Sequence, residues 1–128
     1  MDNPIEAPVF KPKSERTLPF RGKLIATADL ADGKGYVSLR SLCDAFGLDP
    51  RAQRKRLARQ QGYFAPYTAT ILLSTPGGAQ PALCLMASAV PLFLTGVELE
   101  RVLDPEARDL LTAFLDEAHT VLAEHFGI

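Results

Sequence analysis

The chain has 128 residues, of which 47% are hydrophobic, and its 14 Lys and Arg nearly balance 15 Asp and Glu. This length fits one compact domain, and the apolar content excludes an intrinsically disordered chain. Because no apolar run is long enough to span a bilayer and the N-terminus lacks the pattern of a signal peptide, we predict a cytoplasmic protein without membrane contact.

The first 18 residues have the composition of a tail. Prolines at positions 4, 8 and 12 interrupt regular structure, and Lys11, Lys13 and Arg16 make the segment basic. We therefore predict a flexible tail over residues 1–18 and one folded domain over residues 19–128.

A hairpin and a helix are predicted next. Residues 23–28 have strand composition, an Asp-Gly pair marks a turn, and residues 35–37 can pair back with the first strand. Ser38 has the residue type of a helix N-cap, and Gly47 is placed to end that helix. The apolar residues that share one face of this helix are Leu39, Leu42, Cys43 and Phe46.

A second helix is predicted over residues 50–61. Asp49 suits its N-cap, Pro50 suits its first position, and Gly62 is placed to end it. Because only a few residues separate this helix from the preceding one, the two must form a tight corner, as in a helix-turn-helix.

A second hairpin follows the two helices. Residues 68–74 and 80–85 have strand composition, and the Thr-Pro-Gly-Gly sequence between them supplies a turn. A hairpin directly after two helices is the layout of a winged helix.

The last predicted elements are a short helix or turn over residues 87–93 and a long helix that Asp104 caps and that runs to about residue 125. The apolar stripe of the long helix is wider than packing on one side needs. Either the helix is sandwiched within the domain, or part of the stripe meets a second copy in a homo-oligomer. Together the elements predict a small single α+β domain with a helix-turn-helix or winged-helix-like core, two β-hairpins and a long C-terminal helix.

The predicted helix over residues 50–61 contains five basic residues and no acidic one. At 100° per residue, Arg51, Lys55 and Arg59 form one stripe, and the large apolar Leu57 lies nearly opposite. We therefore predict that Leu57 anchors the helix while the stripe faces outward and contacts phosphates. Arg and Gln on the second helix of such a motif also suit base or backbone contacts. The predicted DNA-binding residues are Arg51, Gln53, Arg54, Lys55, Arg56 and Arg59.

Charge is distributed unevenly along the chain. Residues 11–59 contain twelve Lys or Arg against five Asp or Glu, a net charge of +7, and residues 60–128 contain two against eight, a net charge of −6. A basic half can meet a polyanion while the acidic half stays clear of it. DNA is one predicted partner. The alternative is a protein–protein interaction or dimerisation module that binds an acidic protein surface and no DNA. The simplest interpretation of the uneven charge is that water solvates both charged faces and that neither face has a partner.

Four stretches carry a resemblance to a known family. They are PFRGKLIA at residues 19–26, GYVSLRSLCDAFGLDPRAQRKRLAR at 35–59, ALCLMASAVPLFLTGV at 82–97, and VLAEHF near the end of the last helix. In order and spacing, the chain resembles the N-terminal domain of phage antirepressor proteins from residue 19 onward. The resemblance implies a regulator of phage or prophage transcription that binds a phage-type repressor protein, often as an oligomer. Similar modules in viral BRO-type proteins are associated with DNA binding, in agreement with the basic helix.

No catalytic site, metal site or cofactor is predicted. Cys43 and Cys84 lie in apolar contexts that favour buried thiols. His119 and His125 are six residues apart and do not share a helix face, and a pair such as Asp116 and His119 is common on solvated helices. Because no serine or cysteine has a histidine nearby in sequence, we predict a binding protein and not an enzyme.

Overall fold

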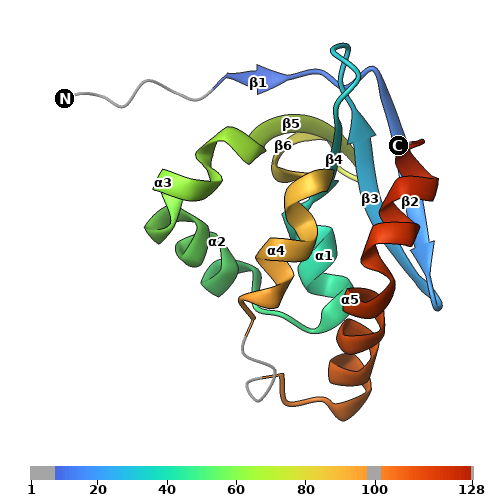
Figure 1. The fold of residues 1–128 in the computed structure, drawn as a ribbon. Coiled ribbons are helices and arrows are strands. Elements are labelled where there is room, and N and C mark those ends of the chain that lie inside the picture. The colour runs from blue at the N-terminus through green and yellow to red at the C-terminus, as the bar shows by residue number, and fades with distance from the viewer. Residues whose placement is uncertain (1–7, 98–101, 128) are drawn as a thin grey trace.

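The computed structural model describes residues 8–97 and 102–127, and over this part the chain forms one sheet with helices packed against it (Figure 1). The mixture of helices and strands is that of the predicted α+β class. The strands are β1 (Val9–Phe10), β2 (Ser14–Phe20), β3 (Lys23–Asp29), β4 (Gly35–Ser38), β5 (Thr68–Thr75) and β6 (Gly78–Met86). The helices are α1 (Leu39–Phe46), α2 (Pro50–Arg59), α3 (Gln61–Phe64), α4 (Val90–Thr95) and α5 (Pro105–Phe126), with 3₁₀ turns η1 (Ala65–Tyr67) and η2 (Ala87–Ala89).

The six strands lie in the order β1-β5-β6-β4-β3-β2. All neighbouring strands are antiparallel except β1 and β5, which are parallel. Three strands separate β2 from β5, yet the carboxylate of Glu15 on β2 accepts hydrogen bonds from the backbone N–H and the hydroxyl of Ser74 on β5, each at 2.9 Å. The sheet must therefore curl strongly, as twisted sheets do.

Both predicted hairpins are present, as β3–β4 and β5–β6, but the predicted winged-helix core is not confirmed. The second hairpin does not stand apart as a wing, because β6 pairs with β4 and so places β5 and β6 in the same sheet as the first hairpin. Pairing between these distant segments, which no local pattern reveals, makes the sheet central to the domain.

The structure differs from the predicted flexible tail at residues 9–10 and 14–18. Val9 and Phe10 pair with β5, and β2 pairs with β3 at seven positions from Ser14 to Phe20. Leu18 and Phe20 alternate inward into the core, and Pro19 is tolerated because β2 is an edge strand. Residues 1–7 of the predicted tail lie outside the described residues.

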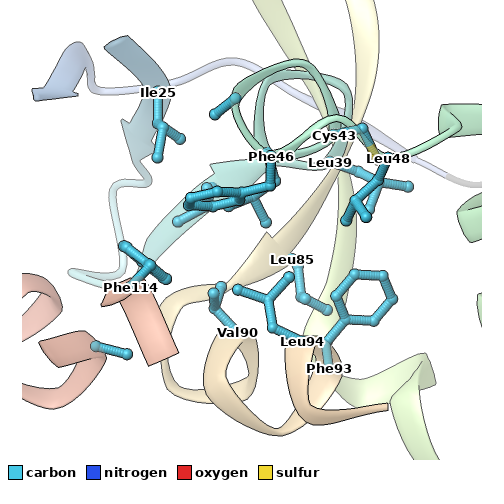
Figure 2. Close-up of a cluster of buried hydrophobic side chains, with 14 of the residues drawn as sticks. Ile25, Leu39, Cys43, Phe46, Leu48, Leu85, Val90, Phe93, Leu94 and Phe114 are labelled. Carbon is cyan, nitrogen blue, oxygen red and sulfur yellow. The ribbon is translucent and has the colours of Figure 1, made fainter. Parts of the chain in front are cut away.

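The main core lies between one face of the sheet and helices α1, α4 and α5. Figure 2 shows Phe46 of α1, Val90 and Leu94 of α4 and Phe114 of α5 gathered near Leu85 of β6, and all five side chains are buried. A smaller cluster occupies the opposite face, because neighbouring residues of a strand point to opposite sides of a sheet. Its buried members are Ala28, Leu30, Tyr36, Ile71, Leu73 and Cys84.

Helix α5 begins and ends close to the predicted positions, with Asp104 as its N-cap. Four of its apolar side chains are buried, and others, including Leu110 and Val121, pack partly buried against the same core. Contacts of α5 with α1 and α4, and of Phe114 with Phe20 of β2, explain much of the wide stripe within one chain. The homo-oligomer through this helix stays a prediction.

The last turn of α5 is held against β2 and β3. The Nε2 atom of His125 lies 2.7 Å from the hydroxyl of Thr27, and Arg16 donates to the carbonyl oxygen of His125 at 2.6 Å. Arg16 also forms an ion pair with Asp29 at 3.0 Å. Burial, together with the positive charge of Arg16, lowers the pKa of His125, so the neutral imidazole is favoured in this contact.

Candidate nucleic-acid interface

The corner between α1 and α2 is formed as predicted. Ser38 caps α1, and Gly47 ends it in the left-handed conformation, with φ of 69°. The carboxylate of Asp49 then accepts a hydrogen bond from the backbone N–H of Arg51 at 3.0 Å, and Pro50 occupies the first turn of α2. Three residues, 47–49, therefore set the direction of α2 relative to α1.

The end of α2 differs from the predicted one. The helix stops at Arg59, because Gln60 has φ of −102° and ψ of 25°, outside the helical range. Residues 61 and 62 belong instead to the short helix α3, so Gly62 does not end α2. The change of direction at Gln60 places Tyr63 and Phe64 beside the last turn of α2.

Four of the six predicted site residues are exposed on α2. Arg51, Lys55 and Arg59 share one side of the helix, and Arg54 borders them. Leu57 is buried with 6% of its surface exposed and anchors the opposite side, as predicted. Among residues 8–97 and 102–127, the ion pairs formed by Arg side chains involve Arg16, Arg21 and Arg40 and no residue of α2.

The other two predicted site residues, Gln53 and Arg56, face inward. The guanidinium of Arg56 lies 4.1 Å from the centroid of the Phe93 ring and donates to the carbonyl oxygen of Phe93 at 2.6 Å. Its Nε–H donates to the side-chain oxygen of Gln53 at 3.0 Å. A Cβ atom on Gly96 would collide with this guanidinium, so the small residue makes room for it. Burial lowers the pKa of Arg56. Arg56, supported by Gln53, therefore joins α2 to α4 and does not extend the exposed stripe.

Beside the stripe lies an apolar groove that the sequence did not predict. It has a volume of about 560 Å³ and lies between the end of α2, helix α3 and helix α4. Tyr63 and Leu92, both about half exposed, belong to its walls. Leu92 is followed in sequence by the buried residues Phe93 and Leu94, and only its exposure in the structure distinguishes it from them.

The two cysteines belong to the packed interior of the domain. Cys43 and Cys84 are buried as predicted, and burial raises the pKa of each thiol to about 12, so both remain protonated. Across residues 8–97 and 102–127, no three His, Cys, Asp or Glu side chains gather as a metal site would require. The helices in the same ranges include none that is long and apolar enough to cross a membrane.

The P22_AR N-terminal domain family matches residues 16–127, from within β2 to the residue after α5. Searches of curated proteins and of solved structures gave no match. Because the match includes the basic helix, the corner before it and the whole of α5, the chain belongs to the P22_AR N-terminal domain family of phage antirepressors, as its sequence resemblance implied.

Proposed function

We propose that this domain regulates phage or prophage transcription and that it contacts DNA through the exposed cations of α2. The family supports a regulatory role in phage. The observation that supports DNA as the partner is the arrangement of Arg51, Arg54, Lys55 and Arg59, which all face solvent from one ten-residue helix with no acidic residue.

Like charges on one helix face repel one another and cost a few tenths of a kcal/mol per pair, about 0.2–0.5 kcal/mol. Binding to a row of phosphates relieves this repulsion, and the bound cations displace counterions from the DNA. Side chains spaced by one helical turn, such as Arg51, Lys55 and Arg59, can follow a phosphate backbone without any rearrangement of the helix. The Asp49 cap and buried Leu57 fix the helix in advance, so little ordering is required on binding.

The acidic side chains of the domain determine from which side DNA can approach. Helix α5 exposes Glu106, Asp109, Asp116 and Glu124, which would repel a polyanion. Figure 1 shows α2 and α5 on opposite sides of α1. DNA bound along α2 would therefore meet the basic side of the domain and keep the acidic helix at a distance.

The proposal is tested by mapping the surface that a DNA duplex contacts. The ¹⁵N-labelled domain is titrated with a short duplex at low salt, and changes in amide chemical shift are followed for every residue. We expect the largest changes in residues 49–60, with the amides of α5 as an internal control that does not move. Changes centred on α5 or on the sheet, or no change at all, would contradict the proposal and favour the alternative of a module that binds protein and not DNA.

A further inference from the structure

The groove between α2, α3 and α4 is a second surface, separate from the basic stripe except at Arg59. Its lining comes from α2, α3 and α4, and Phe93 of α4 contacts both Arg56 of α2 and Phe64 of α3, so the shape of the groove does not depend on a single loop. The lining residues are Arg56, Arg59, Gln60, Gly62, Tyr63, Phe64, Leu92, Thr95 and Gly96. A volume of about 560 Å³ is within the usual range for concave binding sites, about 300–1,000 Å³.

Two large apolar side chains of the groove are exposed to solvent. Tyr63 has 53% of its surface exposed and Leu92 has 50%. Packing holds the groove in place, because the rings of Tyr63 and Phe64 meet edge to face at 5.0 Å and Phe64 meets Phe93 at 5.9 Å. A preformed apolar surface with an exposed tyrosine is typical of the anchor regions of protein interfaces.

The charge at the rim selects the kind of partner. Arg56 and Arg59 border the groove, and none of its lining residues is acidic. The hydroxyl of Thr95 already donates to the carbonyl oxygen of Leu92 at 2.7 Å, which leaves the α4 wall mainly apolar. Such a wall suits an apolar side chain better than the polar edge of a nucleic-acid base.

We propose that this groove docks an acidic segment of a partner protein, with a large apolar side chain seated between Tyr63 and Leu92. Asp or Glu residues next to that anchor would face Arg59 and the accessible edge of Arg56. The docking itself does not depend on DNA binding. One consequence does rest on the proposed function: because Arg59 belongs to both surfaces, the docked segment and a DNA phosphate compete for the same guanidinium.

The proposal is tested with a displayed library of random 16-residue peptides selected on the intact chain. We expect the enriched peptides to combine a large apolar residue with flanking Asp or Glu. A synthetic consensus peptide should bind the Leu92→Ser variant at least about tenfold more weakly than the unmodified protein. The matched control is Leu24→Ser, because Leu24 is 70% exposed on β3 and lies outside the groove, and here the affinity should change by less than about twofold.

Charge variants examine the rim in the same assay. Arg59→Glu should weaken the peptide at least about fivefold, whereas Arg51→Glu, outside the groove, should change its affinity by less than about twofold. Thr95→Glu adds an acid to the exposed α4 wall and should weaken binding even if Leu92→Ser unfolds. Thermal unfolding of each variant checks that it is folded.

Several results would overturn the groove proposal. Enriched peptides that are basic would contradict it, as would peptides that bind Leu92→Ser or Thr95→Glu as tightly as they bind the unmodified protein. A dimer that sedimentation detects and that Leu92→Ser dissociates would make a second copy of the chain the occupant. A duplex that shifts the amides of Tyr63 and Leu92 most strongly would make nucleic acid the occupant. Because Leu92 is outside the stripe, Leu92→Ser should keep its affinity for DNA, so failure of the groove and failure of the DNA proposal give different results.

Discussion

Replacing Arg51, Lys55 and Arg59 together by Ala is expected to weaken binding to a labelled DNA duplex by about two to three orders of magnitude at 0.1 M salt. Each phosphate contact contributes a slope of about 0.9 in the logarithm of affinity against that of salt concentration. Three contacts therefore make the association constant at 0.1 M salt about 2.7 powers of ten larger than at 1 M salt, and the triple variant loses this increase. Fluorescence anisotropy of the duplex measures the loss.

A matched triple variant controls for net charge. Lys13, Lys23 and Lys34 are also exposed cations, but they lie in or beside the sheet, and their replacement by Ala removes the same charge. This variant should lose far less affinity than the α2 variant, through the long-range field alone. Equal losses would contradict the assignment of the contact to α2. Both variants should unfold cooperatively, because none of the six side chains belongs to the core.

Replacing Arg56 by Ala is expected to lower the free energy of unfolding by about 2 kcal/mol. The variant loses the contact of the guanidinium with the Phe93 ring and the charged hydrogen bond to the Phe93 carbonyl oxygen, contributions of about 0.5–2 and about 1.5–3 kcal/mol that overlap. The free energy of unfolding should fall because the Arg56 side chain joins α2 to α4. Chemical denaturation followed by circular dichroism measures the change.

Arg54→Ala is the control for this stability effect, because Arg54 is the exposed cation two positions earlier on the same helix. Its replacement should change the free energy of unfolding by less than about 0.5 kcal/mol. Arg56→Lys should recover only part of the loss, since an ammonium group lacks the planar face that lies over the ring. If Arg54→Ala and Arg56→Ala destabilised the protein equally, the inward placement of Arg56 would be wrong.

Local signals account for the elements that the sequence predicted. Ser38, Asp49 and Asp104 each have a cap residue type, and each side chain accepts a hydrogen bond from the first turn of its helix. Gly47 ends α1 where a left-handed conformation is needed. These effects act within four residues of the chain, so the sequence contains the information directly. The exposed stripe of Arg51, Lys55 and Arg59 was predicted for the same reason, from helical spacing and one anchor residue.

Contacts between distant residues account for what the sequence could not predict. Arg56 lies about 100° from Leu57 around the helix, and its guanidinium turns inward because it contacts Phe93, 37 residues away. Pairing with β3 turns the basic, proline-containing segment 14–18 into a strand, although its composition favoured a tail. The groove likewise exists only because the change of direction at Gln60 brings Tyr63 close to α4.

The salt dependence of duplex binding tests the central claim most directly. The unmodified domain is titrated into a labelled duplex at several salt concentrations, and the logarithm of the association constant is plotted against that of the salt concentration. The four exposed cations of α2 predict a slope of about −3 to −4. No binding even at low salt, or binding that does not change with salt, would contradict the claim that α2 is a DNA-contacting face.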